Sequence, residues 1–148
     1  MRITDPLGTD QKQIFYSCGY KYQLRENYSI QIAIKPKEAI VTDYICLSTD
    51  GLLVFTKGYA WNGCSGPTYD DDTNMRGSLV HDGGYQLMRM GLLGQEWKAY
   101  FDLLFKAICL EDGMWSTRSD YYHWAVDKFG GPSCAEGAEP YPTLIAPK

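Results

Sequence analysis

The sequence predicts an α+β fold, in which an N-terminal antiparallel β-sheet of short strands is followed by three α-helices. Apolar and polar residues alternate over 28–34, which is the two-residue period of a half-buried strand. After residue 75 the apolar residues recur at the spacing of amphipathic helices. A length of 148 residues favours a single domain over 1–148.

The N-terminal half is expected to begin with an arm and to continue as strands. Pro6 and Gly8 stand among polar residues, so we expect residues 1–13 to form an N-terminal arm. Thr49-Asp50-Gly51 separates two apolar runs, and an Asp-Gly pair in that position is a strong hairpin signal. The expected strands lie near Ile14 and over 20–24, 28–34, 43–48 and 52–56.

The C-terminal half is expected to be helical up to a tail. The first helix follows a cap at Thr73 or Asn74 and stops before Gly91. The second helix is expected over 95–111, and the third starts at a capping box formed by Thr117 and Asp120. The pair Gly83-Gly84 inside the first helix predicts that another backbone packs closely against it. Four prolines predict an extended, Pro-rich tail over 132–148.

Composition restricts the classes of partner and compartment. A net charge of −4 and a sequence pI near 5.1 argue against nucleic acid as a partner, because phosphate binding needs a basic surface. No apolar run approaches the roughly 20 residues of a membrane span, so no transmembrane segment is expected. The N-terminus has no signal-peptide pattern, and the five scattered cysteines predict free thiols rather than a zinc site.

The stretch from Tyr59 to Arg89 carries the candidate site. It joins a small-residue loop to the helix that bears His81 and, one turn later, Tyr85. Asp102 lies inside the apolar stripe of the next helix, where a carboxylate needs a partner. We therefore expect His81, Asp102 and Tyr85 to form a catalytic group, with His81 as a general base that Asp102 orients.

The loop offers further candidates. Asp82 and Asn62, with loop carbonyl groups, could hold a divalent cation such as calcium. Gly63, Cys64 and Ser65 are candidates for oxyanion stabilisation, and Cys64 or Ser65 for a nucleophile beside His81. The alternative is structural: His81 and Asp102 could form a satisfied buried network, and Asn62 and Ser65 could simply fix the turn.

These motifs resemble a phage family, the domain-of-unknown-function 1353 family. The resemblance covers the loop Asn-Gly-Cys-Ser-Gly-Pro, the helix His-Asp-x-x-Tyr, the helix Asp-x-x-Phe and a last helix ending in Phe-Gly. The matching residues are Gly63, Ser65, Pro67, His81, Asp82, Tyr85, Asp102, Phe105, Val126, Phe129 and Gly130. The chain departs from the family at Asn62, where Asp is usual, and at Trp97-Lys98, where an Arg is common. The resemblance implies a phage or prophage source and no established activity.

A second resemblance is to secreted and small prokaryotic phospholipases, which share the order of glycine loop, His-Asp-x-x-Tyr helix and distant Asp. It implies His81 as general base, Asp82 as calcium ligand and Asp102 as the orienting group. We therefore expect a phage accessory or virion-associated protein that hydrolyses an ester or amide. The alternative is a non-catalytic virion or interaction protein. The expected partners are other phage structural proteins or a host envelope component, and the expected location is the virion or host cytoplasm.

Overall fold

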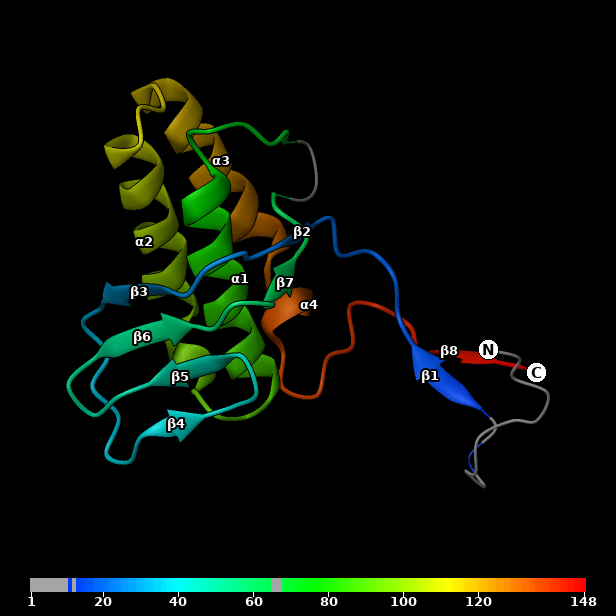
Figure 1. The fold of residues 1–148 in the computed structure, drawn as a ribbon. Coiled ribbons are helices and arrows are strands. Elements are labelled where there is room, and N and C mark those ends of the chain that lie inside the picture. The colour runs from blue at the N-terminus through cyan, green and yellow to red at the C-terminus, as the bar shows by residue number, and fades with distance from the viewer. Residues whose placement is uncertain (1–10, 12, 65–67) are drawn as a thin grey trace.

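The computed structural model describes residues 11, 13–64 and 68–148, and it confirms the α+β class. Short strands occupy the N-terminal part and helices follow them (Figure 1). Most of the expected arm, 1–13, lies outside the described residues. The strands are β1 (Ile14–Tyr16), β2 (Tyr22–Gln23), β3 (Tyr28–Gln31), β4 (Ile40–Val41), β5 (Ile45–Leu47), β6 (Leu52–Phe55), β7 (Ala60–Trp61) and β8 (Leu144–Ala146).

The largest sheet has four antiparallel strands in the order β3-β6-β5-β4. The predicted hairpin is confirmed, because β5 and β6 are joined by the turn that contains Asp50 and Gly51. Gly51 has a φ of 87°, a conformation that side chains other than glycine rarely adopt. The Asp-Gly signal therefore sets the register of the central strand pair.

The strand expected over 28–34 is shorter than its pattern. Burial alternates through the whole run, and Ile32 and Ile34 are buried, but β3 ends at Gln31. The backbone N–H of Ala33 donates to the hydroxyl of Tyr100, 2.8 Å away, instead of to a neighbouring strand. The alternating pattern thus reports which side chains face the core and not where strand pairing stops.

Within the described residues the strands form three sheets, whereas the sequence predicted one. β2 pairs with β7, and β1 pairs with β8 from the far end of the chain. The β1–β8 pair projects away from the helices (Figure 1). No local pattern links residue 15 to residue 145, so this pairing could not be read from the sequence.

The helices are α1 (Met75–Arg89), η1 (Gln95–Trp97, a 3₁₀ turn), α2 (Lys98–Glu111), α3 (Ser116–Phe129) and α4 (Gly131–Cys134). The three expected helices are confirmed, and α4 is an additional short one. The extended tail predicted over 132–148 is therefore wrong at its start, because Pro132 occupies the first turn of α4, where proline is tolerated. None of the helices in the described part of the chain is long and apolar enough to cross a bilayer.

Two predicted helix caps have other roles. Asn74 precedes α1, but its side chain bonds the backbone of Tyr69 and Asp71 instead of the helix. The capping box at Thr117 is wrong, because α3 begins one residue earlier and Trp115 is its N-cap. Sequence spacing identified both helix starts to within two residues without identifying the bonds that form there.

The core lies between the four-stranded sheet and α1. Its sheet side consists of buried Ile32, Ile34, Ile45, Leu47, Leu53 and Phe55. A Cβ at Gly83 would overlap the ring of Phe55, and a Cβ at Gly84 would overlap the ring of Phe101 on α2. The expectation that a backbone packs on this glycine pair is therefore wrong, since two aromatic rings do. α1 is wedged between sheet and α2, and this position brings His81 within reach of Asp102.

Candidate functional site

Asp102 is the centre of the polar cluster. It is 1% exposed, and its Oδ1 accepts hydrogen bonds from Nε2 of His81 at 2.7 Å and from the hydroxyl of Tyr85 at 2.6 Å. Its Oδ2 accepts one from Nζ of Lys98 at 2.7 Å. The structure therefore brings together His81, Asp102 and Tyr85, the three residues that the sequence grouped. Lys98, for which the sequence predicted no role, is the fourth member of this cluster.

Lys98 connects the cluster to α3. Its ammonium group also donates to the backbone carbonyl groups of Val126 at 3.1 Å and Asp127 at 3.2 Å. All three ammonium protons thus have acceptors, and the charge of Asp102 is balanced by a cation on its own helix. The spacing of Lys98 and Asp102, one helical turn apart, was the signal that could have identified this pair.

The cluster controls the protonation of Asp102 and His81. Burial alone would raise the pKa of Asp102, but the hydrogen bonds from His81, Lys98 and Tyr85 hold that pKa below its usual value. Burial lowers the pKa of His81, and the bond to Asp102 together with the charge of Asp82 outweighs it, so this pKa lies above its usual value. An ionised Asp102 requires the proton on Nε2, and deprotonation of the imidazolium therefore frees Nδ1.

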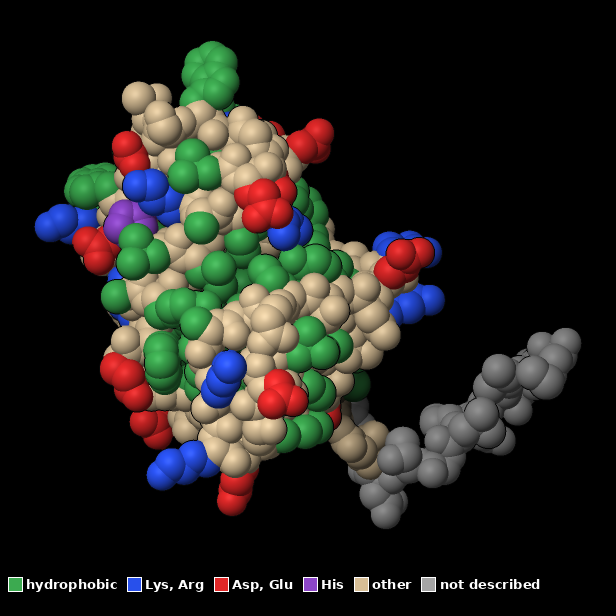
Figure 2. Space-filling model, turned by 90° about the vertical axis from the view of Figure 1, so that its left-hand side faces the viewer, with side chains coloured by type: hydrophobic (Ala, Val, Ile, Leu, Met, Phe, Trp, Pro, Cys, Tyr) green, Lys and Arg blue, Asp and Glu red, His purple; other side chains and the backbone are tan. Residues whose placement is uncertain are grey.

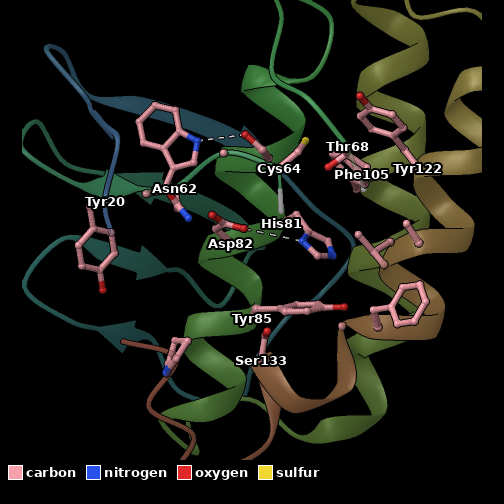
Figure 3. A pocket seen from close by; sticks show the side chains of 18 of the residues that line it. Tyr20, Asn62, Cys64, Thr68, His81, Asp82, Tyr85, Phe105, Tyr122 and Ser133 are labelled. Carbon is pink, nitrogen blue, oxygen red and sulfur yellow. Dashed lines mark hydrogen bonds and ion pairs between the residues drawn. The ribbon is translucent and has the colours of Figure 1, made fainter. Parts of the chain in front are cut away.

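The second ring nitrogen of His81 points toward Asp82. Nδ1 lies 3.9 Å from Oδ1 of Asp82, which is too far for a hydrogen bond (Figure 3). Burial raises the pKa of Asp82, while the charges of His81 and Arg89 and the backbone N–H of Asn62 act against it. Figure 3 shows His81, Asp82 and Tyr85 projecting from α1. In neutral His81, Nδ1 therefore carries a lone pair that lies near the Asp82 carboxylate and accepts no hydrogen bond from it.

His81 and Asp82 both line a cavity of about 270 Å³. This volume is just below the roughly 300–1,000 Å³ typical of small-molecule sites. Its wall contains many aromatic side chains, and its polar members include Asn62, His81, Asp82 and Arg89. The aromatic residues of the lining are Tyr20, Tyr59, Trp61, Tyr85, Phe105, Tyr122, Phe129 and Tyr141. His81 is only 7% exposed, but it lines a space large enough for a substrate group and a water molecule.

The loop before α1 is held by Asp70. Its Oδ1 accepts the backbone N–H of Cys64 at 2.8 Å, and its Oδ2 accepts the hydroxyl of Tyr22 at 2.6 Å. Gly63 has a φ of 74°, and a Cβ there would strike the Asp70 carboxylate. Asp70 thus fixes the loop at one side of the cavity.

These contacts decide among the roles expected in the loop. The N–H of Cys64 is taken by Asp70 and is not free to stabilise an oxyanion. Burial raises the pKa of the Cys64 thiol, so the thiolate that a nucleophile requires is disfavoured. Gly63 lines the cavity. Ser65 lies outside the described residues, so the alternative in which Ser65 is the nucleophile beside His81 and Asp102 also lies outside them.

The pair predicted for a metal, Asp82 and Asn62, shares the cavity. Within residues 11, 13–64 and 68–148, no group of three His, Cys, Asp or Glu side chains could hold a metal ion. Oδ1 of Asn62 is buried and has no hydrogen-bond partner. Asp82 and Asn62 supply one carboxylate and one amide oxygen, so loop carbonyl groups and water would have to supply the rest of the 6–8 oxygens that calcium takes.

No protein-family model, curated protein or solved structure matches the chain. The resemblance to the phage family thus stays an expectation. The class that this geometry defines is a small α+β protein with an aromatic cavity and a histidine oriented by a buried carboxylate.

Proposed function

We propose that this chain is a phage-encoded accessory or virion-associated hydrolase of esters or amides, with His81 as its general base. The observation that carries the proposal is the orientation of one imidazole. Nε2 is bonded to buried Asp102, and Nδ1 lies 3.9 Å from Asp82, a carboxylate that lines the same cavity as His81. A histidine arranged in this way can accept a proton from water.

The reaction follows from the protonation states. Neutral His81 takes a proton on Nδ1 from a water molecule while the water oxygen forms a bond to the substrate carbonyl carbon. The same proton then passes to the leaving oxygen or nitrogen as its bond to carbon breaks. Asp102 stabilises the imidazolium in between and stays ionised, since three donors surround it. Tyr85, whose pKa is raised by burial and by Asp102, stays neutral and holds the carboxylate in place.

The phage assignment is supported by the motifs that the chain shares with the phage family. A phage hydrolase of this size would act on a lipid or cell-wall ester or amide, at a host envelope component or beside other virion proteins. The cavity accommodates only a small part of such a substrate. We therefore expect recognition of the group around the scissile bond rather than of an extended polymer.

The test compares His81→Gln with His123→Gln on ester, lipid and peptidoglycan substrates. His123 is the second of the two histidines of the chain, and it does not line the cavity. Loss of a general base lowers the rate by about 10²- to 10⁴-fold, so His81→Gln should lose turnover by that factor and His123→Gln should keep it. Turnover that survives in His81→Gln would overturn the proposal.

A second function is favoured by the completeness of the polar cluster. Asp102 satisfies donors from α1 and α2, and Lys98 ties it to the end of α3. Such a network also suits a non-catalytic virion protein whose helices must keep a fixed geometry. In that case wild-type protein turns over none of the substrates, and His81→Gln changes only the free energy of unfolding.

A further inference from the structure

Arg89 lies at the meeting point of two cavities. It belongs to the last turn of α1 and lines the cavity that reaches His81. It also lines a second cavity of about 460 Å³, formed with residues of β1 and of the C-terminal segment. Tyr20, Pro140 and Tyr141 are likewise common to both cavities. A group bound at Arg89 would therefore be reachable from either side.

The Arg89 guanidinium is available to a ligand. The ion pairs of the described residues involve Arg76, His81, Lys98, Lys106 and Arg118, and Arg89 is not among their cations. Its side-chain bond in the described structure is a long one, 3.4 Å, from Nη1 to the backbone carbonyl of Ser133. Arg76, by contrast, holds Asp112 through two nitrogens at 3.0 and 2.7 Å. A guanidinium has five N–H donors, so most of those of Arg89 remain unused.

Arg89 and Asp82 place opposite charges along one side of the cavity. They are seven residues apart on α1, which is about two turns and roughly 10 Å along the axis. Residues at this spacing project from the same face, and helical side chains lean toward the N-terminus. Nη1 of Arg89 lies 3.4 Å from the Ser133 carbonyl, whereas Asp82 lies beside His81, where its charge would repel an anion. An anionic substrate is thereby oriented with its charge at Arg89.

We propose that Arg89 selects substrates in which a carboxylate or phosphate lies several bonds from the scissile carbonyl. This inference rests on the proposed hydrolase function and specifies its substrate class. The rings of Tyr20 and Tyr141 have centroids 4.8 Å apart, and both residues line the two cavities together with Arg89. They provide an apolar surface for the part of the substrate that joins the anion to the carbonyl group.

The kinetic test uses two matched esters, mono-4-nitrophenyl glutarate and its neutral methyl ester. Wild-type protein should show the higher kcat/KM for the anionic ester. Arg89→Gln, which keeps a donor for the Ser133 carbonyl, should lose about tenfold to a hundredfold on the anionic ester alone, because charged hydrogen bonds contribute that much. Arg89→Lys should recover part of the loss, and Arg25→Gln, which removes an exposed arginine, should change neither ester. Equal losses on both esters, or no preference in wild type, would overturn the inference.

A binding measurement separates this inference from the hydrolase proposal. Calorimetry on His81→Gln compares monomethyl glutarate and methyl phosphate with neutral dimethyl glutarate. Tighter binding of either anion, weakened at least tenfold by adding Arg89→Gln, supports Arg89 as the anion site even if no substrate is turned over. The preferred anion identifies the class of substrate. Equal affinity for the anionic and neutral probes, or no binding of either anion, overturns the inference whatever the fate of the hydrolase proposal.

Discussion

At the scale of residues, one buried carboxylate, that of Asp102, determines the protonation of its neighbours. Asp102 has both a cation, Lys98, and a titratable imidazole, His81, as partners, and these compete for its negative charge. The pKa of His81 is raised above about 6.5, its ordinary value. A base with a raised pKa is inactive while protonated, so activity should increase as the pH rises through that pKa.

Lys98→Met tests this competition. Removal of the ammonium group leaves His81 as the only cation beside Asp102, so the pKa of His81 should rise further and the ascending limb of the pH–rate profile should move to higher pH. The unfolding free energy should fall by about 1–3 kcal/mol, since a buried carboxylate loses a partner. Lys98→Arg should restore both properties. An unshifted profile in Lys98→Met would exclude a tuning role for Lys98.

The same pKa shifts predict how stability depends on pH. His81 has a raised folded pKa, so its contribution is complete below its unfolded pKa and is lost as the pH rises through the folded value. Asp102 has a lowered folded pKa, so its contribution is lost as the pH falls through that value. The difference in unfolding free energy between wild type and His81→Gln should therefore be larger at about pH 5.5 than at about pH 9. Urea denaturation at the two pH values measures this difference. An equal difference at both pH values would contradict the shift of His81.

At the scale of elements, the position of α1 depends on two residues without side chains. Gly83 admits the ring of Phe55 and Gly84 admits the ring of Phe101, so that α1 approaches both the sheet and α2. The helix loses about 1 kcal/mol at each glycine relative to alanine. Close packing offsets that loss and also sets the distance across which His81 meets Asp102.

Gly84→Ala should therefore destabilise the protein in spite of the better helix propensity of alanine. The new Cβ overlaps the ring of Phe101, and overpacking of this kind costs about 1–3 kcal/mol, which exceeds the propensity gain of about 1 kcal/mol. Gly131→Ala is the control, because nothing lies within 4 Å of a Cβ at that position. Chemical denaturation should give a lower midpoint for Gly84→Ala only. A stabilised Gly84→Ala protein would show that the helices can move apart freely.

At the scale of the whole molecule, the β1–β8 pair differs from the body. It stands away from the sheet and helices (Figure 1), and its strands carry exposed apolar side chains, among them Ile14, Phe15 and Ile145. Figure 2 shows other hydrophobic side chains gathered over the middle of one face of the body, with charged side chains mostly around them. An isolated two-stranded pair is marginally stable in water. The β1–β8 pair should consequently open independently of the core.

Hydrogen exchange tests this independence. Amides of β1 and β8 should exchange much faster than those of β5 and β6, whose side chains Ile45, Leu47, Leu53 and Phe55 are fully buried. The pattern can be measured by exchange with mass spectrometry or NMR at a pH where the protein is stable. Equal protection in both regions would mean that the β1–β8 pair shares the cooperativity of the core.

Local patterns were sufficient for the order of elements and for several site residues. The alternation over 28–34, the Asp50-Gly51 turn and the helical spacing each reflect a preference of a short segment, and such preferences survive in the fold. His81, Asp82 and Asp102 stood out because a histidine beside an aspartate and a carboxylate in an apolar stripe are chemically conspicuous. Lys98, Asp70 and Arg89 did not, since a charged residue alone is usually on the surface.

By itself, the sequence determined the α+β class, the strand faces that are buried and the group His81, Tyr85 and Asp102. Only the tertiary structure decided that β1 pairs with β8, that Lys98 shares Asp102 with His81 and that His81 lines a cavity. The physical reason is distance along the chain. Periodicity records how each residue is placed relative to its neighbours, whereas contacts between remote segments depend on how helices and sheets pack, and here that packing depends on the fit of two aromatic rings against two glycines.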